Sequence, residues 1–277
     1  MENLVWLITG TSQGFGKELV HAALKRGDYV VALSRTPDKV LSLFPEYEER
    51  LLTLPLNLCN PTEISKVTQQ AIDHFGRIDV LVNNAGYGLL GAIEEVADQE
   101  ILDIFEVNFF GLLRLTRAVL PHMREKRSGH IVNISSIVGL VGFPGGGLYS
   151  ATKFAVAGLS ESLAKEVAPL GIHVTVVEPG PFRTDFLGSS IVVTKQTIPD
   201  YEKSSLRNYA IENHNKQPGD PTLAATVIIE AILSEKPPLH LVLGASAYAR
   251  AHKKLKELHE NLSSWEKQSL SCDFTSP

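Results

Sequence analysis

Cysteine, long apolar runs and excess basic charge are all scarce in this sequence. The 277 residues include two cysteines, Cys59 and Cys272, which stand far apart and form no Cys-x-x-Cys pair. This argues against a disulfide framework, and a chain of this length buries enough apolar surface to fold without one. The sparse cysteines, and the absence of an export signal near the start, favour a reducing, cytoplasmic setting.

Charge, hydropathy and histidine spacing argue against further classes of protein. The 26 basic and 31 acidic residues leave a net charge of −5, so we expect no basic face and no nucleic-acid partner. No apolar stretch approaches the roughly 18 residues of a membrane span, and we expect no membrane partner. The nine histidines lack His-x-x-x-His spacing, so we expect no metal site.

The apolar pattern predicts strands that alternate with helices. Short runs rich in Val, Ile and Leu are typical of strands buried on both faces, and they occupy residues 4–8, 29–33, 51–58, 80–82, 131–134, 173–177 and 239–243. Helical spacing covers residues 14–27, 61–75, 98–126, 148–169, 221–234 and 245–265. This order predicts an α/β fold, a single doubly wound parallel sheet flanked by helices, in one domain over residues 1–277.

Two segments near the end of the chain do not fit the regular alternation. Residues 183–219 lack clear periodicity, and we predict a substrate lid that is mobile without ligand. The helix at 245–265 carries a stripe of four large apolar residues, and we expect this face to dock on the domain surface or on a neighbouring subunit. Its basic residues are expected to face solvent, and they are Arg250, Lys253, Lys254 and Lys256.

A glycine-rich segment follows the first predicted strand and opens the first predicted helix. Gly10, Gly14 and Gly16 stand in the run from Thr9 to Gly16. Glycines at such a turn bring backbone N–H groups and a helix N-terminus against a pyrophosphate. The strand before and the helix after supply the context that a dinucleotide-binding loop requires.

The motifs together resemble the short-chain dehydrogenase/reductase family, over about residues 4 to 244. The spacing Gly-x-x-x-Gly-x-Gly begins the resemblance, and four further features continue it, namely Asn83-Asn84-Ala85-Gly86, Asn108, Ser136 and the run from Tyr149 to Lys153. Pro179-Gly180 closes the sixth predicted strand. Asn83 to Gly88 and the overall length resemble the hydroxysteroid- and retinol-dehydrogenase-like branch. The family implies a Rossmann fold and hydride transfer with a nicotinamide cofactor.

Tyr149 and Lys153 point to acid–base chemistry on independent grounds. Four residues apart on a helix, the phenol and the ammonium share one face. A nearby positive charge lowers an acidic pKa by about 1–3 units, so we expect Lys153 to make Tyr149 a proton donor or acceptor near neutral pH. The resemblance adds Ser136 as the residue that orients the substrate oxygen and Asn108 as the support of a proton-relay water. Ser135 is the alternative to Ser136, but alternation along the strand places the two on opposite faces.

The end of the second predicted strand indicates the cofactor. An acidic residue there binds the ribose hydroxyls of NAD, whereas this chain has Ser34 and Arg35, which favour the 2′-phosphate of NADP(H). The resemblance extends the cofactor site to Asn57 and Leu58, to Thr184, and to the remaining candidates: Thr11, Ser12, Gln13, Phe15, Asn84, Ala85, Gly86, Pro179 and Gly180, with Tyr149 and Lys153 shared with catalysis.

These residues predict an NADP(H)-dependent enzyme that interconverts an apolar carbonyl compound and its alcohol. The expected substrate wall is apolar and lacks an evident carboxylate-binding arginine; it comprises Tyr87, Leu89, Leu90, Val138, Leu140, Val141, Phe143 and Leu148. The alternatives are an NAD-preferring alcohol dehydrogenase and a dinucleotide-sensing regulator, although a regulator would not need the tyrosine and lysine. The resemblance also implies a homodimer or homotetramer that pairs the helices at 98–126 and 148–169.

Overall fold

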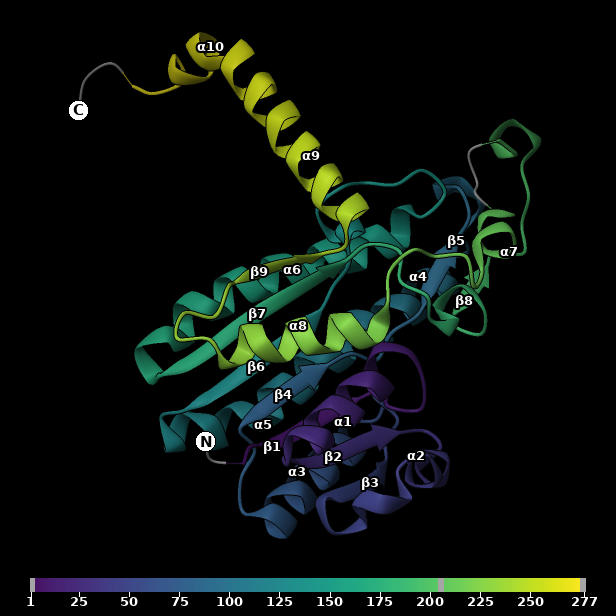
Figure 1. The fold of residues 1–277 in the computed structure, drawn as a ribbon. Helices are drawn as coiled ribbons and strands as arrows, with labels where there is room; N and C mark the ends of the chain where they lie inside the picture. The colour runs from purple at the N-terminus through teal and green to yellow at the C-terminus, as the bar shows by residue number, and fades with distance from the viewer. Residues whose placement is uncertain (1–2, 204–206, 275–277) are drawn as a thin grey trace.

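The computed structural model describes residues 3–203 and 207–274, and a seven-stranded parallel sheet forms its centre (Figure 1). The strand order is β3-β2-β1-β4-β6-β7-β9. The strands are β1 (Val5–Thr9), β2 (Tyr29–Ser34), β3 (Leu51–Pro55), β4 (Val80–Asn83), β6 (Gly129–Ile134), β7 (Ile172–Pro179) and β9 (His240–Leu243). The predicted doubly wound parallel sheet is therefore confirmed, and the carboxyl ends of its strands meet at one edge.

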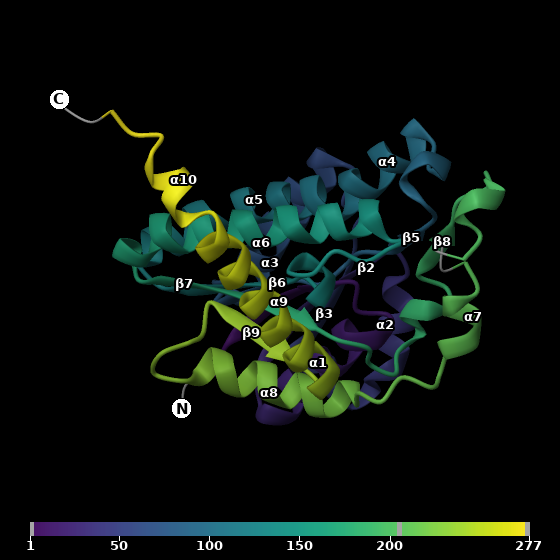
Figure 2. The same ribbon diagram turned by 90° about the horizontal axis from the view of Figure 1, so that it is seen from above.

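Helices cover both faces of the sheet (Figure 2). One face carries α1 (Gly14–Arg26) and α8 (Pro221–Leu233), and the other carries α3 (Pro61–Phe75), α5 (Leu112–Lys126) and α6 (Gly147–Val167). Side chains that accept backbone N–H bonds begin two of these helices, Asn60 at α3 and Asp220 at α8, and each is followed by proline. The shorter helices are α2 (Pro37–Leu43), α4 (Asp98–Phe105), α7 (Tyr209–Asn213) and α10 (Glu266–Leu270).

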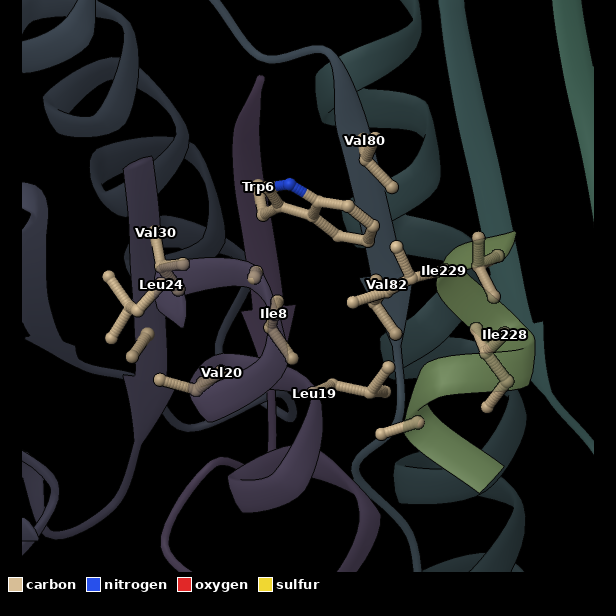
Figure 3. Close-up of a cluster of buried hydrophobic side chains, with 14 of the residues drawn as sticks. Trp6, Ile8, Leu19, Val20, Leu24, Val30, Val80, Val82, Ile228 and Ile229 are labelled. Atoms are coloured by element: carbon tan, nitrogen blue, oxygen red, sulfur yellow. The ribbon is translucent and has the colours of Figure 1, made fainter. Parts of the chain in front are cut away.

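Alternation along β1 supplies both faces of the core. Trp6 and Ile8 pack against α1 and α8, as Figure 3 shows, while Leu7 packs in the cluster on the opposite face. All three side chains are fully buried. Because both faces of the strand need apolar residues, the sequence shows a continuous apolar run instead of an alternating one.

A chain of buried amides and hydroxyls crosses the second face. The Nδ2 of Asn83 on β4 donates to Thr116 on α5 at 3.0 Å and to the Oδ1 of Asn133 on β6 at 2.8 Å. The Nδ2 of Asn133 in turn donates to the hydroxyl of Ser160 on α6 at 2.9 Å. These hydrogen bonds join two central strands to the two helices that cover them.

The predicted helix at 98–126 is three segments in the structure. A π-helical turn (Glu106–Gly111) separates α4 from α5, and it contains Asn108. Such turns are rare and occur frequently at functional sites. Two phenylalanines near the predicted subunit contact are partly exposed, Phe110 on this turn at 43% and Phe154 on α6 at 44%. The expected pairing of these helices between subunits stays a prediction.

The segment predicted as an irregular, mobile lid contains regular secondary structure. Within 183–219, strand β8 (Ile191–Val193) pairs in parallel with β5 (Gly88–Leu90), and helix α7 follows. The buried carboxylate of Glu95 anchors the segment through Arg207 at 3.0 Å and the backbone N–H of Ile198 at 2.8 Å. Residues 204–206 of the expected lid lie outside the described part of the chain.

The expected docking of the C-terminal helix on the domain surface is wrong for most of its length. Helix α9 (Ala245–Ser264) buries Ala247 and Ala251 against the domain and then projects away from it (Figure 1). Leu255 and Trp265 are 63% and 64% exposed, and Leu258 and Leu262 are also exposed. Small alanines allow the first two turns to approach closely, whereas the larger apolar residues lie beyond the edge of the domain. Within residues 3–203 and 207–274, no helix is long and apolar enough to cross a membrane.

We predict that the carboxylate of Asp28 is a principal stabilising group of the β1–β2 region. It is fully buried and accepts hydrogen bonds from Trp6 Nε1 at 2.9 Å and from Arg26 Nε at 2.7 Å. Asp28→Ala leaves these donors unpaired and should lower the free energy of unfolding by about 3–5 kcal/mol. Denaturant unfolding measures the loss.

Glu257→Ala serves as the control for this prediction. Its ion pair with Lys253, at 3.7 Å, is exposed on α9, so the change should cost less than about 1 kcal/mol. Equal effects of the two substitutions would contradict the assignment.

Candidate active site

A cavity of about 720 Å³ opens at the carboxyl edge of the sheet, and segments that follow β1, β2, β3, β4, β6 and β7 line it. This is the edge at which open α/β sheets bind ligands. The predicted residues in its lining are Gly10, Ser12, Gln13, Gly14, Phe15, Ser34, Arg35, Asn57, Leu58, Asn84, Ala85, Gly86, Ser136, Tyr149, Lys153, Pro179, Gly180 and Thr184. Three predicted site residues, Thr11, Gly16 and Asn108, lie behind this lining.

The glycine-rich turn requires its glycines for two physical reasons. Gly10 and Gly14 have φ values of +69° and +57°, which side chains rarely adopt. A Cβ on Gly16 would lie 2.2 Å from the carbonyl oxygen of Gly10, so no other residue fits between α1 and β1. Gln13 at the N-cap makes no side-chain capping bond, which leaves the first N–H groups of α1 available to an anion.

Asn84 and Thr11 hold this turn in place. The Nδ2 of Asn84 donates to the carbonyls of Thr9 at 2.9 Å and Gly10 at 3.1 Å. The hydroxyl of Thr11 donates to the carbonyl of Leu33 at 3.2 Å, and this residue is buried. Asn84 thus joins the ends of β1 and β4, and Thr11 joins the turn to β2.

Tyr149, Ser136 and Lys153 converge in the cavity. Tyr149 lies in the first turn of α6, and Lys153 follows one turn later with its Nζ 5.8 Å from the centre of the Tyr149 ring. Ser136 follows β6 and is hydrogen-bonded to Tyr149. The ammonium of Lys153 is buried and donates to the carbonyl of Ile134 at 2.8 Å. Three polar groups with different chemistry therefore face one space.

Burial sets the protonation of this group more strongly than the charge of Lys153 does. Burial raises the pKa of the Tyr149 phenol, and its hydrogen bond with Ser136 offsets only part of that rise. Burial also lowers the pKa of Lys153 to about 8. The expected depression of the Tyr149 pKa is therefore wrong for this geometry, because burial of the phenol raises its pKa. Tyr149 is a neutral phenol at physiological pH and holds a proton that it can donate.

The two neighbouring serines have separate tasks. The hydroxyl of Ser135 is buried and donates to the backbone carbonyl of Lys153 at 3.0 Å. Ser136 instead contacts the Tyr149 phenol, and its hydroxyl donates to the carbonyl of Pro179 at 3.5 Å and accepts from the N–H of Val138 at 3.3 Å. The structure therefore brings Ser136 and not Ser135 to the phenol.

Asn108 supports the site from behind. Its Nδ2 donates to the carbonyl of Tyr87 at 2.8 Å, and its Oδ1 accepts from the N–H of the same residue at 3.0 Å. A Cβ on Gly86 would lie 3.0 Å from the Asn108 Oδ1 and 3.7 Å from the Lys153 Nζ. The side chain of Asn108 thus positions the loop at Gly86 and Tyr87.

The far end of the cavity lies beside the carboxyl ends of β2 and β3. Ser34 is buried and accepts from the N–H of Thr36 at 3.1 Å, while Arg35 is exposed at the rim. Asn57 accepts from the N–H of Cys59 at 3.0 Å, which shapes the adjoining loop. In the lining formed by described residues, the acidic member is Asp185, which belongs to the segment after β7 and not to this end.

The structure revises the expected substrate wall. Tyr87, Leu90, Val138 and Phe143 line the cavity. Leu140 and Val141 pack on α9 instead, and Leu89 and Leu148 belong to a small core cluster.

The cavity residues that sequence reasoning did not single out include Tyr209, Gln217 and Arg250. Gln217 is 4% exposed, and neither of its side-chain amide atoms has a hydrogen-bond partner among the residues that the structure describes. Leaving a buried amide unpaired is costly, so the Gln217 side chain is available to pair with a polar group of a bound molecule.

The sequence matches a family model described as short chain dehydrogenase over residues 4–191. A 3-ketodihydrosphingosine reductase of Bacteroides thetaiotaomicron is 37% identical over 88% of this chain and 89% of its own. Retinol dehydrogenase 8 of Bos taurus is 36% identical over 84% of this chain and 79% of its own.

Solved structures agree with these matches. A short-chain dehydrogenase of Streptomyces avermitilis superposes with a TM-score of 0.93 at 42% identity, covering 99% of this chain and 100% of its own. ElxO with NADP bound has a TM-score of 0.76 at 29% identity, covering 90% of this chain and 100% of its own. The glycine turn, the cavity at the carboxyl edge and these matches show that the chain belongs to the short chain dehydrogenase family of oxidoreductases.

Proposed function

We propose that this oxidoreductase interconverts a ketone or aldehyde and its alcohol with NADP(H) as cofactor. The observation that carries the proposal is the convergence of a neutral Tyr149 phenol, the Ser136 hydroxyl and the buried Lys153 ammonium in one cavity. A bound nicotinamide supplies the hydride for reduction and takes it up in the reverse direction. Where NADPH is more abundant than NADP⁺, the reaction runs in the direction of carbonyl reduction.

The residues of the site divide the remaining work. Ser136 donates a hydrogen bond to the carbonyl oxygen and places it beside the phenol of Tyr149. Tyr149 gives that oxygen its proton, which is available because burial raises the pKa of the phenol. Lys153 holds positive charge next to the ring, and this stabilises the phenolate left after the transfer.

Tyr149→Phe removes the transferred proton and leaves the ring in place. We expect kcat to fall about 10²- to 10⁴-fold, while the affinity for NADPH changes little. Steady-state kinetics monitored by NADPH absorbance measure kcat, and titration with NADPH measures the affinity for the cofactor. Tyr47→Phe, on a tyrosine outside the cavity lining, should leave both unchanged. A Tyr149→Phe enzyme that keeps more than about a tenth of kcat would exclude Tyr149 as the acid.

The preference for NADP(H) rests on the rim beside β2. Ser34 and Arg35 offer a hydroxyl and a positive charge there, and the acid that would bind ribose hydroxyls is absent from this position. ElxO, which is similar in fold and 29% identical, binds NADP and so supports the proposal.

Arg35→Ala should remove most of this preference. A charge-assisted bond to the 2′-phosphate contributes about 1.5–3 kcal/mol, so the ratio of kcat/KM for NADPH over NADH should fall roughly 10- to 150-fold. Lys39→Ala, an exposed cation on the neighbouring α2 and outside the lining, is the matched control. A wild-type enzyme that prefers NADH would overturn the cofactor assignment.

We also propose that residues 183–219 act as a substrate lid. The segment lines the cavity through Phe186, Leu187 and Ile191, and the side-chain amide of Gln13 donates to Ser189 at 3.0 Å and to Ser190 at 3.2 Å. The lid is therefore bonded to the glycine turn itself. A ligand seated on that turn adds contacts to both and excludes water from the cavity.

Hydrogen exchange tests the lid directly. We expect bound NADPH to slow amide hydrogen exchange in residues 186–203, because its contacts with this segment hold the segment closed over the cavity. Helix α8 lies in the core and should exchange equally slowly in both conditions. Strong and equal protection of residues 186–203 with and without NADPH would show a permanently docked segment instead.

A further inference from the structure

The docked base of α9 brings a cation to the substrate side of the cavity. Ala247 and Ala251 are buried against Ile137, in the turn that follows Ser136, and Val138 packs on the same cluster. This contact places the intervening Arg250 in the cavity lining. Arg250 is exposed, as expected for the polar side of the helix, and it also lines the cavity, whereas the exposed Lys253 lies outside the lining.

The guanidinium of Arg250 lies over an aromatic ring. It lies over the ring of Phe143, 5.9 Å from its centre, and Phe143 contacts Tyr209 edge-on at 6.0 Å between ring centres. Phe143 belongs to the loop between Ser136 and Tyr149, so this is the side of the cavity that holds the reacting groups. Arg35 lies with the β2 residues at the adenosine side. A guanidinium held over a ring keeps its N–H edges free for an anion.

Arg250 has no carboxylate partner in the described part of the chain. The charged residues that line the cavity are Arg35, Lys153, Asp185 and Arg250. Asp185, the acid among them, is hydrogen-bonded to Ser189 and lies 3.7 Å from the ring of His214. The cavity thus has an excess of positive charge in a chain whose net charge is −5.

We propose that Arg250 binds an anionic group at the end of the substrate remote from its carbonyl. The inference rests on the proposed function and narrows its substrate class to amphiphilic oxo compounds. The carbonyl lies at Tyr149, an apolar body contacts Val138, Leu187 and Phe143, and a carboxylate or phosphate reaches Arg250. Arginine binds both anions through paired N–H bonds, so the shared chemistry is a terminal oxyanion.

Direct binding tests the proposal without relying on turnover. The wild-type protein is saturated with NADPH, which fills the Arg35 side, and is titrated calorimetrically with decanoate, decyl phosphate and methyl decanoate. The three probes share an apolar chain and differ in charge. We expect at least one anion to bind about tenfold or more tightly than the neutral ester, which corresponds to about 1.4 kcal/mol. The anion that binds more tightly distinguishes a carboxylate substrate from a phosphate one.

Arg250→Gln should abolish that preference and leave the binding of methyl decanoate unchanged. Arg250→Lys should retain part of it, because charge persists without the planar fork. Lys253→Gln, on the solvent side of the same helix, should bind all probes as the wild type does. Equal binding of the anions and the ester by the wild type, or an anion preference that survives Arg250→Gln, would overturn the proposal.

Failure of the proposed function gives a different result. If the enzyme used other chemistry, Tyr149→Phe would retain activity while the dependence of anion binding on Arg250 remained. For a substrate pair with and without the anion, Arg250→Gln should raise KM for the oxo acid about tenfold, with kcat and the KM of the oxo ester nearly unchanged. A fall in kcat for both substrates would indicate a structural role instead.

Discussion

The close approach of two backbone segments at the end of β1 is the constraint on which the cavity depends. Helix α1 begins so near to this strand that only hydrogen fits on Gly16 opposite the Gly10 carbonyl. Asn84 spans the same point and bonds the end of β1 to the loop after β4. Because the turn is this tight, the N-terminus of α1 faces the carboxyl edge of the sheet. Ser136, after β6, and Tyr149, in the first turn of α6, line the same cavity.

Within that cavity, burial changes the pKa values of the two titratable groups, Tyr149 and Lys153. A solvent-exposed phenol or ammonium keeps a pKa close to its ordinary value. Here burial raises the pKa of Tyr149 and lowers that of Lys153, so the neutral form of each group is favoured. The ammonium of Lys153 donates to the backbone carbonyl of Ile134, and no carboxylate in the described part of the chain pairs with it. A proton on Tyr149 and an uncompensated charge on Lys153 suit a reaction in which negative charge develops on oxygen.

Local patterns predicted the sheet, the glycine turn and the spacing of Tyr149 and Lys153, because each is encoded within a few consecutive residues. Contacts between distant residues were not predictable in this way. Strand β5 pairs with β8, Gly88 opposite Ile191, although about a hundred residues separate them in the chain. The local sequence pattern predicted neither strand. Arg250 reaches the cavity because two alanines let α9 dock, which no periodicity reveals. The direction of the Tyr149 pKa shift depends on burial, which the spacing alone does not contain.

The buried chain of polar groups from Asn83 to Ser160 has a consequence for the reacting geometry. Asn133 stands three residues before Ser136 on the same stretch of chain, and Ser160 belongs to the helix that carries Tyr149. A slip of β6 by one residue, or a shift of α6 along its axis, would leave a buried amide or hydroxyl without a partner, at a cost of about 1–3 kcal/mol each. The hydrogen bond between Asn133 and Ser160 therefore fixes the position of β6 along α6. In this way it fixes Ser136 relative to Tyr149, although it lies away from both of their hydroxyls.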